Sequence, residues 1–207
     1  RNGRRDIDGN IMGTLFVDKL DPQSGTSLEL GSSGDTITIP SGCTITNSGT
    51  NGGGFGDDQL PAFFAYAGSN QTITNNTWTK IEVNTEDLDS DSTYDHSTNY
   101  RFTPAVEGRY VFEFGVNCFT SSQTDINYIQ VAIYKNGSSY GYMYNDYQAS
   151  RVYGSQTNGS FTITSDDNDY FELYARCQTN SGGNPVVQGH GGRVTFFGAT
   201  RLTGVVS

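Results

Sequence analysis

The stretch from Phe102 to Phe119 constrains the fold more than any other part of this chain. Its second half alternates large apolar residues with residues of mixed character. The apolar set comprises Tyr110, Phe112, Phe114, Val116 and Cys118. A period of two is typical of a β-strand that buries one face. Because Glu107 and Gly108 favour a tight turn, the stretch predicts a long strand that begins after a turn and contributes an aromatic face to a core.

Further alternating runs predict an all-β protein. They lie near residues 62–67, 77–83, 109–119, 128–135, 139–144, 160–164, 170–177 and 193–201, and clusters of Gly, Asn, Asp and Ser separate them. Only 34% of the 207 residues are hydrophobic, but 13 tyrosines and 12 phenylalanines are large enough to fill the core of a sandwich. The pair Asn136-Gly137 between two runs predicts a type I′ hairpin turn.

The spacing within the long strand resembles the signature of C1q-like domains, which share the TNF-like jelly roll. The matching residues are Phe102, Gly108, Tyr110, Phe112 and Phe114. Further matches surround them, namely Trp78-Thr79-Lys80-Ile81, Tyr94-Asp95, Lys135-Asn136-Gly137 and Phe196-Phe197-Gly198. The resemblance covers residues 59 to 202. It implies a C1q/TNF-like jelly-roll sandwich of about ten strands that assembles as a compact homotrimer, and it implies no single activity because one fold hosts many functions.

Residues 1–58 differ in composition from residues 59–207, which we expect to form the jelly-roll domain. Between residues 27 and 46, short alternations of Leu with Glu and of Thr with Ile are separated by Gly/Ser turns. One such segment is too small to offset its ordering entropy. Three copies around one axis could bury the apolar residues together, which predicts a trimeric fibre shaft, and a flexible linker is the alternative. Gly52-Gly53-Gly54 favours a hinge before the domain.

Residues 17–42, VDKLDPQSGTSLELGSSGDTITIPSG, resemble modules that precede C1q-like domains in tail-fibre-like virion proteins of marine bacteriophages. Arg1, Arg4 and Arg5 form a small basic patch ahead of this segment, and we expect the patch to dock onto other virion proteins. The chain as a whole has a formal net charge of −10, which disfavours nucleic acid as a partner. No apolar run is long enough to predict membrane insertion. Because the first residue is arginine rather than methionine, we expect a processed or partial product.

The most unusual local feature is a run of tyrosines late in the chain. Tyr140, Tyr142 and Tyr144 alternate within one expected strand, and Tyr147 and Tyr153 follow soon after. The alternating three are expected to project from one face. A tyrosine ring with its polar tip suits both the stacking of sugars and protein interfaces. The run therefore predicts a trimer contact or a place in the sandwich core, with a ligand contact as the alternative.

Two acidic runs, residues 86–91 and 166–169, are candidate calcium sites. The candidate ligands are Asp89, Asp91, Asp166, Asp167 and Asp169. Calcium takes about six to eight oxygen ligands, and such runs are dense in carboxylates. Neither run has the glycine and the terminal glutamate of an EF-hand loop. The two runs are therefore expected to be solvated turns, with calcium binding as the alternative, and no other cofactor is expected.

The cysteines and histidines indicate no catalytic site. Cys43, Cys118 and Cys177 are widely spaced and match neither a disulfide framework nor a zinc pattern. Cys118 and Cys177 fall on apolar strand faces, which predicts buried free thiols, with a bridge between the two as the alternative. His96 and His190 lie in polar stretches and are expected to be solvated. Since phosphate-binding loops and nucleophile elbows are missing as well, we do not expect an enzyme.

These observations together predict a bacteriophage virion structural protein. It would be a homotrimeric tail fibre or spike whose C1q-like knob lies on the particle surface, tail or capsid, and contacts a host cell-surface glycan or protein. A capsid (head) decoration or fibre protein with a purely structural role is one alternative. A secreted C1q-like recognition protein is another, because four sequons, which begin at Asn70, Asn75, Asn136 and Asn158, could accept glycans.

Overall fold

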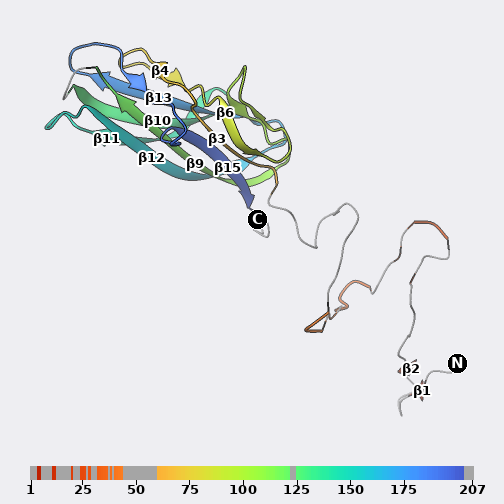
Figure 1. Ribbon diagram of the computed structural model, residues 1–207. Helices are drawn as coiled ribbons and strands as arrows, with labels where there is room; N and C mark the ends of the chain where they lie inside the picture. Colours follow the sequence, from red (N-terminus) through yellow and green to blue (C-terminus); the bar gives the residue numbers. More distant parts are fainter. Residues whose placement is uncertain are drawn as a thin grey trace. The chain divides into compact units, whose positions relative to one another are not determined.

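The computed structural model describes residues 60–121 and 125–202 without interruption, together with short pieces between residues 4 and 43. The chain divides into two units, Arg1–Thr50 and Asn51–Ser207 (Figure 1). In the first unit, two short strands pair antiparallel, β1 (Arg4–Arg5) and β2 (Ile11–Met12). The domain boundary expected after residue 58 and the expected Gly52–Gly54 hinge lie outside the described residues.

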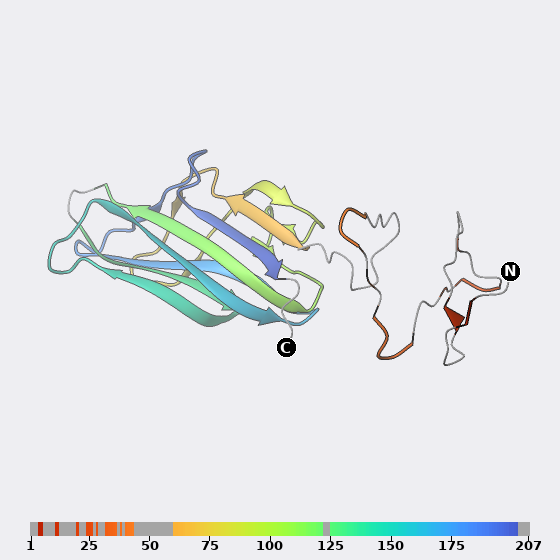
Figure 2. The same cartoon turned by 90° about the horizontal axis from the view of Figure 1, so that it is seen from below.

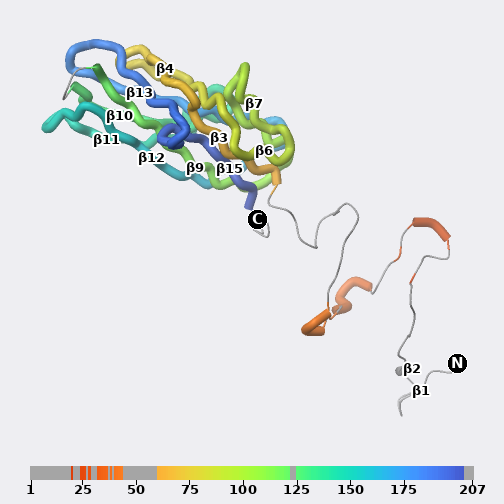
Figure 3. The backbone as a smooth tube through the Cα atoms, viewed as in Figure 1, coloured from red at the N-terminus to blue at the C-terminus, as the bar shows by residue number. Residues whose placement is uncertain are grey.

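The second unit is built from two antiparallel sheets (Figures 1 and 2). The β9 sheet contains β3 (Ala62–Tyr66), β4 (Gln71–Thr72), β6 (Thr85–Asp89), β9 (Gly108–Phe119), β12 (Gly154–Ser165), β14 (Val186–Val187) and β15 (Phe196–Leu202). The β10 sheet contains β5 (Thr79–Lys80), β7 (Tyr94–Asp95), β8 (Arg101–Phe102), β10 (Ile126–Lys135), β11 (Ser138–Asp146) and β13 (Phe171–Thr179). Figure 3 traces the chain through both sheets. No helix in the described residues is long and apolar enough to cross a membrane.

β9 is the central strand of its sheet. β12 pairs with it over its whole length, from Gly154 opposite Phe119 to Ser165 opposite Gly108. β15 and β14 share its other side, one after the other. The long strand expected from the alternation before Phe119 is thereby confirmed, and it positions the elements on both of its sides.

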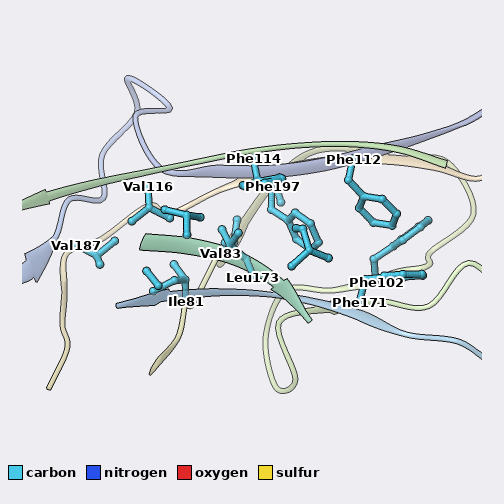
Figure 4. Packing of buried hydrophobic residues seen from close by; sticks show 14 of the residues in the cluster. Ile81, Val83, Phe102, Phe112, Phe114, Val116, Phe171, Leu173, Val187 and Phe197 are labelled. Carbon is cyan, nitrogen blue, oxygen red and sulfur yellow. The ribbon is translucent and has the colours of Figure 1, made fainter. Parts of the chain in front are cut away.

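The core lies between the two sheets (Figure 4). Every member of the alternating set in β9 is fully buried, namely Tyr110, Phe112, Phe114, Val116 and Cys118. The ring centroid of Phe112 lies 4.5 Å from that of Phe171 on β13 and 6.0 Å from that of Phe197 on β15. One ring therefore packs against both sheets, which explains why aromatic residues recur on the inner face of β9.

Two elements differ from the expectation. The acidic run that begins at Glu86 was expected to be a turn or a calcium loop, but most of it forms the edge strand β6, which pairs with β3. β12 begins at Gly154 rather than near Ser160. In both cases a polar segment becomes a strand because a neighbouring strand, β3 for β6 and β9 for β12, offers it hydrogen-bond partners, and local propensity does not record that neighbour.

The hairpin between β10 and β11 has the expected turn. Asn136 and Gly137 have φ angles of 52° and 76°, as a type I′ turn requires. The Asn136 side chain also donates to Asp169 Oδ1 at 2.7 Å and accepts from the Tyr170 N–H at 2.9 Å. The turn is therefore fastened to the loop between β12 and β13.

Gly137→Ala should lower the free energy of unfolding by about 1–2 kcal/mol, because the new Cβ disfavours the left-handed backbone conformation. Urea denaturation followed by circular dichroism measures the loss. Gly191→Ala is the matched control, since an added Cβ there meets open space and the backbone is not left-handed. Equal losses in the two variants would contradict the expectation.

Candidate functional site

The tyrosine run lies on β11, at one edge of the β10 sheet. Tyr142 pairs with Ala132 and Tyr144 pairs with Gln130, so both rings lie on the outer face of the sheet. A register shift next to Ile133 leaves Tyr140 as an extra residue. The Tyr140 ring contacts Phe161 of β12 instead, with ring centroids 6.2 Å apart. The three tyrosines therefore do not form one ladder, because a bulge interrupts the alternation.

The two tyrosines that follow β11 in the sequence have different surroundings. The Tyr147 hydroxyl is 2.7 Å from Ser155 Oγ, and its ring packs against the core. Tyr153 is exposed, and its ring lies 6.2 Å from that of Phe119. Tyr147 therefore contributes to packing, whereas Tyr153 is a surface residue whose ring contacts Phe119.

An aromatic cluster on the outer face of the β10 sheet includes residues that the sequence analysis did not select. We call it the aromatic platform, and it consists of Trp78, Tyr134, Tyr142 and Tyr174. The Trp78 ring centroid lies 6.2 Å from those of both Tyr134 and Tyr142. Tyr134 and Tyr174 stack with their centroids 3.9 Å apart. Ala132 sits between Tyr142 and Tyr174 in the register and is fully buried outside the core cluster, so the rings cover it.

Charged groups beside the aromatic platform have protein partners. Lys80 Nζ lies 2.9 Å from Glu172 Oε1 and also donates to the carbonyl oxygen of Asn99. Arg176 Nε donates to Asn76 Oδ1 at 2.8 Å, and its guanidinium lies over the Tyr128 ring. The charge of Lys80 is therefore paired with a carboxylate, whereas Arg176 is held by neutral groups and keeps its positive charge beside the rings.

The outer face of the β9 sheet carries a second apolar surface. The rings of Phe64 and Phe196 stack with their centroids 5.7 Å apart. They lie against two glycines, since an added Cβ on Gly198 would be 2.9 Å from the Phe64 ring, and one on Gly115 would be 2.6 Å from the Phe196 ring. Leu88, opposite Phe64 in the register, is exposed. We call Phe64, Phe196 and Leu88 the apolar strip.

A hollow adjoins the apolar strip. It has a volume of about 320 Å³, and its lining residues are Glu113, Phe114, Asn158, Gly159, Ser160 and Phe196. Gly115, next to Phe114, keeps this region open because a side chain there would collide with Asn158 Oδ1 and with the Phe196 ring. The strip and the hollow adjoin because Phe196 belongs to both.

The first set of candidate calcium ligands serves the loop after β6. Asp89 accepts hydrogen bonds from the N–H groups of Thr93 and Tyr94 at 2.9 and 3.0 Å. Asp91 accepts from the Ser90 hydroxyl at 3.0 Å. Within the described ranges, no group of three or more His, Cys, Asp or Glu residues could hold a metal ion. The bonds of Asp89, at the end of β6, shape the turn that follows the strand.

The second set lies in the turn between β12 and β13. Asp166 and Asp167 are exposed, whereas Asp169 is buried. Asp169 Oδ2 lies 2.6 Å from Lys135 Nζ and accepts from the Asp166 N–H at 2.7 Å. Burial alone would raise the pKa of Asp169, but the bonds from Lys135, Asp166 and Asn136 outweigh burial and hold that pKa below its usual value. The carboxylate therefore locks the turn to the end of β10.

Asp169→Asn should lower the free energy of unfolding at pH 7 by roughly 1–2 kcal/mol, because the charged hydrogen bonds are lost. A lowered folded-state pKa stabilises the protein above the ordinary pKa of 3.8, and this contribution disappears as the pH falls through the folded-state value. The difference between the two proteins should therefore shrink at acid pH. Urea titrations at pH 7 and at a pH below 3.8 test this. Asp167→Asn, in the same turn but exposed, is the control, and a pH-independent difference for Asp169→Asn would contradict the expectation.

Two of the cysteines lie in the core, and the two histidines form polar contacts. Cys118 and Cys177 are buried free thiols, as expected. A hydrogen bond between them and their burial raise the pKa of Cys118. His96 Nδ1 lies 2.6 Å from Glu86 Oε1, and His190 Nδ1 accepts from the Gly192 N–H. None of these contacts joins a nucleophile to a base.

The arginines of the expected docking patch are only partly covered by the described residues. Arg4 and Arg5 form β1, opposite Met12 and Ile11. Their side chains and the whole of Arg1 lie outside the described residues. Virion docking by this patch stays a prediction.

Comparisons with known proteins support the fold. No family model matches the chain, and no curated protein matches it. Among solved structures, a TNF protein of S. frugiperda, Eiger, is similar with a TM-score of 0.52 and 9% identity, covering 70% of this chain and 94% of that one. The globular domain of the zebrafish complement 1qA protein is similar with a TM-score of 0.46 and 15% identity, covering 67% and 94%. The expected all-β, C1q/TNF-like jelly-roll sandwich is confirmed.

Proposed function

We propose that this chain is a homotrimeric, non-enzymatic display protein of a bacteriophage virion. The jelly-roll domain is the knob of a fibre or spike on the particle surface, and the segment before it connects the knob to the particle. The knob contacts the surface of the host cell. The proposal assigns self-association to one face of the sandwich and recognition to the other.

The observation that carries the proposal is the apolar strip. Phe64 and Phe196 form a flat stacked pair over two glycines, and the exposed Leu88 extends it. A contiguous apolar patch on the open face of a sheet marks an interaction site rather than a solvated surface. Oligomers of identical chains are commonly symmetric and closed. A threefold arrangement that covers three such strips fits the jelly-roll fold, since C1q/TNF-like domains commonly form homotrimers.

The assignment to a virion rests on the N-terminal segment. Residues 17–42 resemble the modules that precede C1q-like domains in tail-fibre-like proteins of marine bacteriophages. The order of a repetitive acidic segment followed by a β-sandwich suits presentation of the sandwich at a distance from its anchor.

Sedimentation velocity of the full chain at micromolar concentration tests the assembly. We expect a species of three times 22.5 kDa. A stable monomer would contradict the proposal. Gold-labelled antibodies on purified particles test the location: label on tail fibres supports the proposal, and label spread over the capsid favours the decoration protein instead.

A further inference from the structure

We propose that the aromatic platform binds a neutral glycan by stacking sugar rings on Trp78 and Tyr142. This inference rests on the proposed function, because it names the class of host ligand that the knob recognises. The juxtaposition of four aromatic side chains carries it, three from strands of the β10 sheet and Trp78 from the residue just before β5. None of the four is required to build the core between the sheets.

The rings of the aromatic platform are inclined to one another. Trp78 is joined edge-on to Tyr134 and Tyr142, with interplanar angles of 61° and 62°. Tyr174 stacks against Tyr134 at an angle of 21°. The surface therefore has rings of differing inclination rather than a single flat plane. A pyranose ring offers a face of C–H groups to an aromatic ring and a rim of hydroxyls to polar tips, and this combination matches an amphipathic aromatic surface.

The paired strands of the β10 sheet hold three of the four rings of the platform in place. Tyr134 and Tyr174 lie on the adjacent strands β10 and β13, and Tyr142 lies on β11 beside them. The strands pair through most of their length, so the rings are held before a ligand arrives. Aromatic side chains also have few rotatable bonds, and binding therefore costs little conformational entropy. Such preorganisation is what a weak, non-ionic ligand such as a sugar requires.

The net negative charge of the chain disfavours anionic ligands. Beside the platform, Lys80 is paired with Glu172, and the guanidinium of Arg176 is already held by Asn76 and the Tyr128 ring, although these groups do not neutralise its charge. The chain carries a net charge of −10, which repels polyanions at a distance. Phosphorylated or sulfated polymers are therefore poor ligands, and a neutral glycan is favoured.

The platform also offers tyrosine hydroxyl groups at the edges of its rings. Within the described part of the chain, the hydroxyl groups of Tyr134, Tyr142 and Tyr174 make no hydrogen bond to another protein group. These hydroxyls are available to sugar hydroxyls at the rim of the rings. The apolar strip on the opposite sheet presents phenylalanine and leucine instead, which suits a protein contact better than a sugar.

Trp78 supplies a direct measurement, because it is the only tryptophan of the chain. Titration of the full-length trimer with soluble dextran, galactan, mannan and chitin oligosaccharides should change its fluorescence saturably for at least one of these neutral probes. Polygalacturonate, an acidic polymer of the same ring size, should not bind. We expect Tyr142→Ala to weaken binding about three- to tenfold, and Tyr142→Phe to retain most of the affinity because the ring remains.

Tyr153→Ala is the matched control, because Tyr153 and Tyr142 are exposed to 51% and 55%, yet Tyr153 lies outside the platform. Its affinity should equal that of the unaltered chain. The inference is overturned if no neutral probe binds at millimolar concentration, if the acidic polymer binds more tightly, or if both alanine variants lose affinity equally. Dissociation of the trimer by Tyr142→Ala would also overturn it, because the platform would then be a contact between copies.

Sedimentation of the same samples separates this inference from the proposed function. A trimer that binds no neutral glycan overturns the glycan inference and leaves the assembly intact. A monomer that binds a neutral glycan through Tyr142 contradicts the trimer and supports the binding surface.

Discussion

Phe112→Ala should lower the free energy of unfolding by about 3–5 kcal/mol, the usual cost of removing a buried phenylalanine ring. Phe112 is fully buried, and its ring packs against Phe171 of the opposite sheet and Phe197 of the neighbouring strand. The loss includes a cavity, because β9 is held on both sides and cannot collapse into the space. A domain of ordinary stability has about 5–15 kcal/mol in total, so the variant should be only marginally stable.

Chemical denaturation followed by circular dichroism measures this loss. Phe114→Ala should behave similarly, since Phe114 is also fully buried on the same face. Phe161→Ala is the matched control, because Phe161 only partly covers the core from β12. We expect that variant to lose clearly less. A loss below about 1 kcal/mol for Phe112→Ala, which is the size of an ordinary surface effect, would show that the ring is not in the core.

The core strand could be predicted because its information is local. Alternation with a period of two marks the buried face of β9 directly in the sequence. The hairpin at Asn136-Gly137 could be predicted for the same reason, since a left-handed backbone at two neighbouring positions selects those residue types. Both features depend on residues a few positions apart.

The two surfaces could not be predicted because they depend on register between distant strands. Tyr134 and Tyr174 each lie in a segment expected to be a strand, but their stacking requires Ala132 to face Tyr174. The bulge next to Ile133 removes Tyr140 from the face of Tyr142 in a way that the alternation does not reveal. A single shift of one residue moves side chains to the other face, so small irregularities decide which rings meet.

The acidic residues show the same limit for candidate ligands. Their density is compatible with turns and with calcium binding alike, and Asp169 forms its bonds to Lys135 and Asn136, which lie more than thirty positions away in the sequence. Calcium binding stays a prediction. An acidic run that caps a turn and an acidic run that binds a cation can have the same residue composition. The partner that distinguishes them is supplied by the fold.

Phe196→Glu should convert the proposed trimer into a monomer at micromolar concentration. Its side chain stacks on Phe64 over Gly115, and in the assembled state a carboxylate there would be buried in an apolar contact. Burial of an unpaired charge costs several kcal/mol, and each 1.4 kcal/mol corresponds to about a tenfold change in affinity. Sedimentation velocity should therefore show the mass of one chain, while circular dichroism should retain the β-sheet signal.

Tyr142→Glu introduces the same charge at an exposed aromatic position on the opposite sheet, and it should remain trimeric. Phe196→Ala, which removes the ring without adding a charge, should weaken association less than the glutamate does. It serves as the uncharged control, which separates the loss of the ring from the effect of the buried charge. If Phe196→Glu stays trimeric while Tyr142→Glu dissociates, the two faces have exchanged roles: the β10 sheet would join the copies, and the apolar strip would be the surface left for an external partner.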